Sequence, residues 1–448
     1  MIILKNATLI DENANVRTRQ DIVVEGGIIR RIVSSDSPQE DMAGENSPEK
    51  SAHLNNIRDD DEVIDCTDYV VTPGLVNLHA HTAMNIFKGI AEDVEADVWF
   101  NEMIWPYESR MTPEDIYTGT VLGIAEMIGN GVTAVADHYF GEEQVLKAAL
   151  DTGIRMDIAP TVFGTAPDFK DRLSRVKEFI KAHSNDSDRV ALRFGPHSNY
   201  TCPGSTLEEI VDTARSMNLP IHLHLSEEEP QVITSREKTG RTPFEVLHDA
   251  GGFQTGVLVA HGLWVEESDV PLLGEDTWFA FCPKTYMKLG YGRGGFFSNY
   301  DRLHFGFGTD GAASSNTVNI IEQARLFALL EKFERRDALV MDAAAVWKHL
   351  MEGHRALPFG SGRMQEGAPA DLVIWDLWTP DTCAFYNPLS AILYSAGSAN
   401  VRYTMVGGEF LKADGRLKLN VKELMQDLRL RQKELLGRGK GKAQVYYG

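Results

Sequence analysis

The sequence predicts an α/β protein that consists of a TIM-like (β/α)8 barrel and a small β-sandwich built from both ends of the chain. Strand and helix patterns alternate from Gly74 to about Gly362, as they do in a parallel barrel. Strand patterns without intervening helices lie on either side of this region. The chain has 448 residues, and one barrel takes roughly 250, which leaves room for a second unit.

Residues 1–71 are predicted to supply the N-terminal part of the β-sandwich. Residues 21–25 and 28–33 are strand-like and are separated by two glycines, which is typical of a hairpin. Residues 34–61 are polar and acidic and predict an exposed loop. Another strand pattern follows at residues 62–71.

Residues 72–362 are predicted to form the barrel. The eight expected strands are residues 75–80, 132–138, 154–159, 190–196, 220–225, 256–261, 277–282 and 304–309. The clearest helix is expected at residues 113–128, where Thr112 suits the N-cap and Pro113 suits the first turn. An open doubly wound sheet is the structural alternative.

Residues 363–448 are predicted to complete the β-sandwich and to end in a helix. The expected strands are residues 370–375, 401–406 and 409–411. We expect them to pair with the N-terminal strands. The last helix is expected at residues 421–435, and the basic segment at residues 437–442 is expected to be solvated.

The composition excludes several classes of partner. Asp and Glu number 65 against 44 Lys and Arg, which gives a formal net charge of −21. Such a surface repels phosphate backbones and anionic lipids, so we expect neither nucleic acid nor a membrane as a partner. The four cysteines are widely spaced, and no secretory leader pattern is evident, so the cytoplasm is the expected location. A homo-oligomer is compatible with the sequence.

Residue types that bind metals recur at the predicted strand ends. His79 and His81 form an H-x-H pair whose side chains share a face. His224, His261 and Asp310 end or follow later strands, where catalytic groups of such barrels gather. Buried structural histidines would explain one such placement but not five. Imidazoles and a carboxylate can hold a divalent metal beside a water, which predicts a metal-dependent hydrolase.

His222 is the alternative ligand to His224, because residues two apart on a strand share a face. His224 is preferred since it lies nearer the strand end and only three residues before Glu227. His222 is then expected to lie deeper, as a packing residue or as a partner of a ligand. His138, at the end of the second barrel strand, is expected to line the pocket or to bond within a loop.

Five segments carry a resemblance to a known family. They are TPGLVNLHAH at residues 72–81, HLSE at residues 224–227, AH at residues 260–261, GTDGAAS at residues 308–314 and GRMQEGAPADLV at residues 362–373. On these segments the chain resembles the amidohydrolase superfamily, in its adenosine/cytosine-type aminohydrolase and chlorohydrolase branch. The resemblance covers nearly the whole chain except the acidic loop.

The resemblance implies one catalytic metal ion and a set of roles around it. The implied ligands are His79, His81, His224 and Asp310. Glu227 would carry a proton to a ring nitrogen of the substrate, and His261 would orient the attacking water. Asp310 would also accept a proton from that water. Zinc is the usual metal of the family, although iron, nickel or manganese can occupy such sites.

Within the branch, the chain is similar to S-adenosylhomocysteine/5′-methylthioadenosine deaminases. This implies that Glu108 contacts a ribose, that His197 contacts the nucleoside and that Arg172 contacts the substrate tail. The alternatives are an exposed helix acid, a loop histidine and a structural arginine. FCPKTYMKLG at residues 281–290 departs from the family pattern, and Phe281 and Tyr286 there predict a more apolar pocket wall.

The sequence therefore predicts a metal-dependent aminohydrolase that acts on C–N bonds in cyclic amidines. The favoured substrate is an adenosine-type nucleoside, namely S-adenosylhomocysteine, 5′-methylthioadenosine or adenosine, with release of ammonia. An s-triazine hydrolase or a guanine- or pterin-type deaminase would use the same metal site. A non-catalytic metal-binding barrel is the alternative from another class, but a scaffold would need neither Glu227 nor Asp310.

Overall fold

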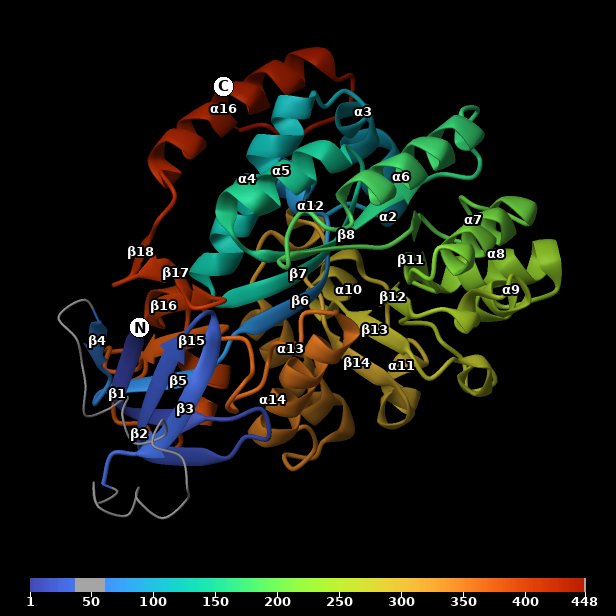
Figure 1. Cartoon of the computed structure of the whole chain (residues 1–448). Coiled ribbons are helices and arrows are strands. Elements are labelled where there is room, and N and C mark those ends of the chain that lie inside the picture. Colours follow the sequence, from blue (N-terminus) through green and yellow to red (C-terminus); the bar gives the residue numbers. More distant parts are fainter. Residues whose placement is uncertain (37–60, 447–448) are drawn as a thin grey trace.

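The structure is a computed structural model that describes residues 1–36 and 61–446. Most of the predicted acidic loop therefore lies outside the described residues. Figure 1 shows two parts: a sheet that contains both the first and the last strands of the chain, and a group of parallel strands covered by helices.

Strands from both ends of the chain form one sheet. They are β1 (Ile2–Ile10), β2 (Val16–Glu25), β3 (Ile28–Ser34), β4 (Glu62–Asp65), β5 (Tyr69–Pro73), β15 (Leu372–Asp376), β16 (Val401–Val406), β17 (Glu409–Ala413) and β18 (Arg416–Leu417). The order is β18-β17-β16-β15-β5-β1-β2-β3, with β4 paired to β1. The antiparallel pair β5–β15 joins the two ends of the chain, as expected.

The predicted hairpin is confirmed, since β2 and β3 pair antiparallel on either side of the two glycines. The β-sandwich is not confirmed, because the hydrogen bonds connect all nine strands into one sheet. Side chains on one face of this sheet form a small core of their own, with Leu4, Ile22, Val71 and Leu372 among the buried residues.

Parallel strands occupy the middle of the chain in the predicted order. They are β6 (Leu75–Ala80), β7 (Val132–Tyr139), β8 (Arg155–Val162), β9 (Val190–Leu192), β10 (Gly195–Pro196), β11 (Ile221–Leu225), β12 (Val257–His261), β13 (Thr277–Phe281) and β14 (His304–Phe307). Strands β6 to β10 form one curled sheet and β11 to β14 form another. The fourth predicted strand is divided, because β9 and β10 are separated at Arg193 and Phe194.

Local contacts connect these two parallel sheets. Parallel bridges join Phe194 to Ile221 and Ser198 to His224. On the other side, the backbone N–H groups of Thr309 and Asp310 both donate to the carbonyl oxygen of His79, at 3.0 Å each. The parallel strands therefore bring the segments after β6 and β14 together, as expected for a fold of the TIM-barrel type.

Helices cover the parallel strands (Figure 1). The longer ones are α4 (Pro113–Gly129), α5 (Glu142–Thr152), α6 (Phe169–His183), α7 (Ser205–Ser216), α8 (Glu229–Thr239), α13 (Ile320–Arg335), α14 (Ala343–Glu352) and α16 (Val421–Arg438). The shorter ones include α2 (Ala96–Val98), α3 (Trp105–Glu108), α9 (Pro243–Asp249), α10 (Pro283–Leu289), α11 (Phe296–Asn299), α12 (Ala312–Ser315) and α15 (Pro388–Ser390). In the described part of the chain, no helix combines the length and apolar character that a membrane span requires.

Helix α4 begins where the sequence predicts. The Thr112 hydroxyl accepts from the backbone N–H of Asp115, and the Asp115 carboxylate accepts from that of Thr112. This capping box satisfies two backbone donors that a helix leaves free at its start. Helix α16 also lies where predicted. In the basic segment at residues 437–442, Gly437, Lys440 and Lys442 are exposed, as expected, but Gly439 and Gly441 are not. That segment packs against residues near α3.

A buried ion pair joins the barrel strands to the terminal sheet. Arg155, at the start of β8, donates from Nε to Asp371 Oδ2 (2.7 Å) and from Nη2 to Asp371 Oδ1 (3.1 Å). The exposed fractions of the two residues are 5% and 1%. The N–H of Gly407 also donates to the carboxylate (2.8 Å). Asp371 therefore depends on Arg155 for its charge compensation.

Arg155→Ala should lower the free energy of unfolding by roughly 3–5 kcal/mol, because it leaves a buried carboxylate without its partner. Arg175→Ala serves as the control, since it removes an exposed pair with Asp168 and should cost at most about 1 kcal/mol. Urea denaturation of both variants measures the difference. Equal effects would contradict a structural role for the buried pair.

Candidate metal centre and active site

The backbone is strained where three parallel strands end. Ser226, His261 and Asp310 have φ values of 46°, 71° and 58°. Residues other than glycine rarely adopt this region, and those that do gather at functional sites. Each of the three closes or follows a strand, namely β11, β12 or β14. The strain therefore lies at the end of the strands where the sequence predicts the chemistry.

Two histidines at this end are oriented by backbone carbonyl groups. His81 Nδ1 donates to the carbonyl oxygen of His138 (2.6 Å), and His224 Nδ1 donates to that of His197 (2.9 Å). With Nδ1 engaged, the two Nε2 atoms lie 3.1 Å apart. Hydrogen bonds of this kind fix the tautomer and ring orientation of metal-binding histidines.

His222 supports the ring of His79 from a deeper position on β11. Its Nε2 lies 3.0 Å from His79 Nδ1. The opposite nitrogen of His79, Nε2, is buried and has no hydrogen-bond partner among the described residues. It faces Asp310 Oδ1 at 3.5 Å. These contacts support the interpretation that His222 assists a ligand and that His79 is one.

Asp310 turns its two carboxylate oxygens to different partners. Oδ1 lies 3.3 Å from His81 Nε2, while Oδ2 accepts hydrogen bonds from the hydroxyls of Ser314 and Thr285. Burial opposes ionisation, but the nearby imidazole groups of His79 and His81 outweigh it and hold the pKa of Asp310 well below its usual value. Asp310 is therefore a carboxylate, which is the form that binds a metal.

The donor atoms fit a divalent metal ion. Burial lowers the pKa of His79 to about 3 and that of His224 well below its usual value, so both imidazoles are neutral, as ligands must be. Burial also disfavours the charged form of His81, but the Asp310 carboxylate raises the pKa of His81 to about 9, so a metal ion would displace a proton from this ring. Four donors arranged tetrahedrally at bond lengths of about 2.1 Å would lie about 3.4 Å apart. The separations of 3.1, 3.3 and 3.5 Å between donors agree with that value.

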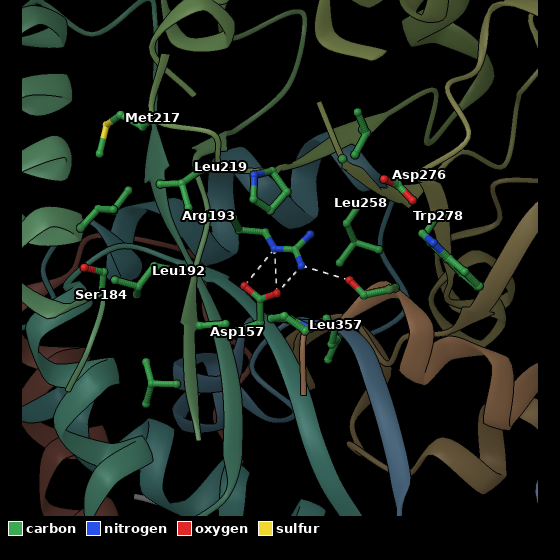
Figure 2. Close-up of a pocket in the computed structure, with 18 of the residues that line it drawn as sticks. Asp157, Ser184, Leu192, Arg193, Met217, Leu219, Leu258, Asp276, Trp278 and Leu357 are labelled. Carbon is green, nitrogen blue, oxygen red and sulfur yellow. Dashed lines mark hydrogen bonds and ion pairs between the residues drawn. The ribbon is translucent and has the colours of Figure 1, made fainter. Parts of the chain in front are cut away.

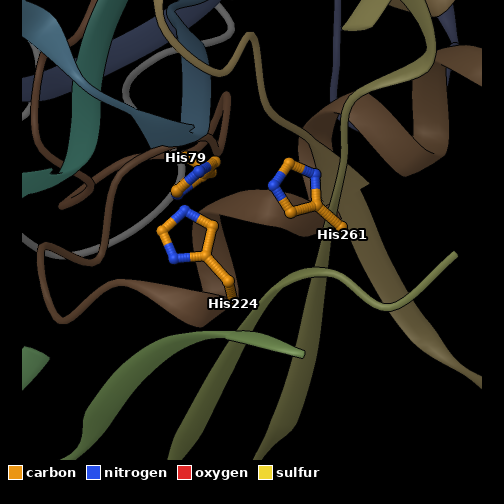
Figure 3. A group of neighbouring side chains, drawn as sticks. All are labelled: His79, His224 and His261. Carbon is orange, nitrogen blue, oxygen red and sulfur yellow. The ribbon is translucent and has the colours of Figure 1, made fainter. Parts of the chain in front are cut away.

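His261 and Glu227 lie beside these donors. The rings of His79, His224 and His261 face a common space (Figure 3), and one nitrogen of each lies within 4.8 Å of the others. His261 Nε2 is 3.5 Å from Glu227 Oε1. Burial, reinforced by the charge of Asp310, raises the pKa of Glu227 to about 7. A carboxyl group with such a pKa can exchange a proton near neutral pH.

Two of the predicted substrate residues lie next to the histidines. Glu108 is buried and accepts a hydrogen bond from Tyr139 Oη at 2.7 Å. The Tyr139 ring lies 6.2 Å from the ring of His81. The ring of His197 lies 4.8 Å from that of His224. The structure therefore brings Glu108 and His197 to the same end of the barrel as the metal-binding groups.

No contact among the described residues joins Arg172 to the histidines. Its guanidinium donates to both carboxylate oxygens of Glu142, at 2.7 and 2.9 Å, and to the carbonyl oxygen of Thr161, at 3.0 Å. These contacts hold α6 against the end of β8. A contact between Arg172 and the substrate stays a prediction.

The sequence does not identify the side chains that orient the candidate catalytic groups. Thr285 and Ser314 hold Asp310, and Tyr139 holds Glu108. Of these side chains, only Ser314 could have been proposed from the sequence, because it follows Asp310 by four residues, which is about one helical turn. The partners of the other two are distant in the sequence.

The predicted apolar pocket wall is wrong at Phe281. Its ring is fully buried and stacks on Phe296, with centroids 4.1 Å apart. Strand side chains alternate between faces, and Phe281 points outward to the helices. Tyr286 does lie at the site, since its ring is 5.6 Å from that of His261.

A cavity of about 690 Å³ lies at the opposite ends of the strands (Figure 2). Its lining includes Arg193 and also Trp278, which lies near the start of β13. Arg193 forms an ion pair with Asp157. Active sites of such barrels form at the C-terminal ends of the strands. This cavity is therefore separate from the candidate active site.

Comparisons with known proteins agree with the motifs. The family model described as "Amidohydrolase family" matches residues 70–411. A 5-methylthioadenosine/S-adenosylhomocysteine deaminase of Dictyoglomus thermophilum is 35% identical over 382 residues, which cover 84% of this chain and 90% of that protein. A 5′-deoxyadenosine deaminase of Methanosphaera stadtmanae is 32% identical over 399 residues, which cover 87% and 94%.

A solved structure is similar over nearly the whole chain. It is an adenosine deaminase of Xanthomonas campestris with bound zinc, at 25% sequence identity. The TM-score is 0.89, and the match covers 97% of this chain and 98% of that one. The arrangement of parallel strands described above is therefore shared with a metal-binding deaminase.

His224→Ala should lower the metal content of the purified protein well below the expected value of about one divalent ion per chain, because it removes an oriented imidazole. Metal analysis after dialysis measures this. His248→Ala is the control, since His248 is half-exposed on α9 and its ring lies 3.7 Å from Asp249. Full metal occupancy in His224→Ala would contradict the ligand assignment and favour His222.

Proposed function

The chain belongs to the amidohydrolase family, and we propose that it is a metal-dependent aminohydrolase that deaminates an adenosine-type nucleoside. The observation that carries this proposal is a pair of donor groups that share His79, one with His224 and His261 and one with His81 and Asp310, beside the proton-exchanging Glu227. The names of the relatives support the substrate class. S-adenosylhomocysteine, 5′-methylthioadenosine and adenosine are the candidate substrates, and ammonia is released.

The proposed metal is one zinc ion. The ligands would be His79, His81, His224 and Asp310. A bound divalent ion supplies Lewis acidity that makes water a nucleophile near neutral pH. Zinc is supported by the nitrogen and oxygen donors and by the zinc in the Xanthomonas campestris structure. Iron, nickel and manganese accept the same donors.

The side chains around the metal position divide the proton transfers between them. His261 orients the attacking water through its ring. The water oxygen adds to the carbon that carries the amino group. Glu227 delivers one of the water protons to the neighbouring ring nitrogen, and Asp310 takes the other and passes it to the amino group. The amino group leaves as ammonia and the ring keeps the oxygen, so atoms and protons balance.

The proposal keeps the domain division predicted from the sequence. Residues 72–362 form the catalytic barrel, and residues 1–71 and 363–448 together form the smaller unit. The net charge of −21 supports a small heterocyclic substrate without nucleic acid or membrane partners. The four free cysteines support a cytoplasmic enzyme. A homo-oligomer is compatible with this function.

Glu227→Gln should retain the metal and much of the substrate affinity, while kcat falls by roughly 100-fold or more, because a positioned proton carrier is lost. Steady-state ammonia release and metal analysis test this together. Glu228→Gln is the matched control, since it changes the neighbouring carboxylate and keeps the Glu227–His261 contact. A near-normal kcat in Glu227→Gln would remove this residue from the mechanism.

Glu108→Ala should impair turnover of adenosine-type nucleosides more than turnover of adenine, because a ribose hydroxyl would lose its buried partner. Ammonia release from both substrates, compared with that of the exposed control Glu114→Ala, measures the difference. If triazines, guanine or pterins are hydrolysed while every adenosine analogue is inert, the alternative substrate class is correct.

A further inference from the structure

The segment after α16, residues 439–446, is anchored to the connection between β6 and α4. We call it the C-terminal tail and call residues 81–112 the β6–α4 connection. The backbone N–H groups of Lys442 and Gln444 donate to the carbonyl oxygens of Glu102 (2.8 Å) and Ile90 (3.0 Å). Gln444 also bonds through its side-chain amide to both backbone groups of Glu92. The tail therefore fixes the backbone of the connection at several separate points.

Helix α16 delivers the tail to this place. It lies along α4 and reaches α3 (Figure 1). Thr118 on α4 donates to Asp427 on α16 (2.7 Å). At the last turn of α16, Arg438 donates to the buried carboxylate of Asp115 (2.6 Å). The path of the tail is thus set by a helix that is itself held to the barrel.

Two glycines of the tail enclose the ring of Tyr107. A Cβ atom at Gly439 would come within 2.1 Å of Tyr107 Cδ1, and one at Gly441 would come within 2.4 Å of Tyr107 Cε2. The Tyr107 hydroxyl donates to the carbonyl oxygen of Gly441 (2.6 Å). Tyr107 is 4% exposed. Only glycine allows the tail to approach the ring this closely.

Two other residues of α3, Trp105 and Glu108, contact side chains that lie next to the candidate site. Glu108 accepts the hydrogen bond from Tyr139, whose ring lies near His81. Trp105 contacts Phe163, with centroids 6.2 Å apart. Phe163 in turn lies 4.7 Å from the ring of His197. Helix α3 therefore places one residue toward the tail and two toward the proposed nucleoside end of the site.

Glu92, whose backbone the tail binds, also contacts the segments that follow β13 and β14. Its carboxylate accepts from Lys288 Nζ (2.5 Å) and from Asn316 Nδ2 (2.5 Å). Lys288 belongs to α10, which follows β13, and Asn316 follows α12, which comes after Asp310. The tail, which binds the backbone of Glu92, therefore also supports a contact across the end of the barrel.

We infer that the C-terminal tail is a positioning element for substrate binding, which holds Tyr107 so that Glu108 and Trp105 keep their places at the site. The inference rests on the proposed function, because it assigns the nucleoside as the part of the substrate that the tail affects. The tail contacts none of the proposed metal ligands in the described structure. Its loss should therefore weaken substrate binding without removing the metal.

Glycine-to-alanine changes test this with a matched control. Gly439→Ala and Gly441→Ala each introduce a Cβ against Tyr107, whereas a Cβ at Gly437 would meet nothing within 4 Å. Gly439 has ordinary extended backbone angles of −82° and 164°, so only the new contact disturbs it. Gln444→Ala removes the side-chain bonds to Glu92 without adding bulk, and it remains informative if the glycine variants fold poorly.

Steady-state kinetics with 5′-methylthioadenosine and with adenine provide the first measurement. In Gly439→Ala, Gly441→Ala and Gln444→Ala, KM for the nucleoside should rise by roughly 10-fold or more, since misplacement of a binding group has effects of this size. KM for adenine, kcat and metal content should change far less. Gly437→Ala should match the wild type. Unchanged nucleoside KM in the three variants would overturn the inference, as would an equal rise in Gly437→Ala.

Hydrogen–deuterium exchange separates failure of this inference from failure of the proposed function. In Gly439→Ala, faster exchange should be confined to residues 88–108. Faster exchange throughout the barrel would mean that the tail only stabilises the fold and would overturn the inference. If the wild type deaminates no adenosine-type nucleoside, the proposed function fails. Local exchange at residues 88–108 then still decides whether the tail positions this connection, and unchanged exchange would overturn that role.

Discussion

The hydrogen bonds from the N–H groups of Thr309 and Asp310 to the carbonyl oxygen of His79 are the contact on which the active site depends. The backbone carbonyl of His79 thereby joins β6 to the segment after β14. The imidazole of the same residue belongs to the candidate metal-binding group. Asn77 reinforces the junction, since its side chain accepts from Thr309 N–H and donates to Thr309 Oγ1. A shift of one residue between these strands would turn the ligands to opposite faces. The contact that joins β14 to β6 therefore also positions the proposed metal ligands.

The hydrophobic periodicity of the sequence predicts the strands and helices of this fold better than it predicts how they pair and pack. Each of the eight expected barrel strands is present, and α4 begins at its predicted cap, because burial and capping act within a few residues. The division of the strand at residues 190–196, the single sheet formed by both chain ends and the packing of the tail on Tyr107 are different. The sheet and the tail depend on partners hundreds of residues away, and the divided strand depends on its pairing with β8 and with Ile221. Such partners leave no local pattern in one sequence.

The same distinction applies to the site. Strand ends meet at one end of a parallel barrel, so placing His79, His81, His224 and Asp310 together requires only their positions along the chain. Their ring orientations depend on the carbonyl groups of His138 and His197, which the sequence does not mark. Arg172 is another example, because its ion pair with Glu142 leaves no mark in the sequence, while its contact with the substrate stays a prediction. Phe281 is a further example, because it ends a strand beside the site and yet its side chain faces the helices.

The chemistry and the substrate selectivity of this enzyme rest on different kinds of structure. The proposed metal-binding and proton-transfer groups stand at or just after the ends of buried strands, where backbone hydrogen bonds hold them. Glu108 and Trp105 stand on the β6–α4 connection, which consists of short helical segments and is supported by α16 and the tail. Rigid strands can keep one chemistry while such connections change, because the connections share few contacts with the strands. The strand-end motifs therefore identify the reaction more reliably than the substrate.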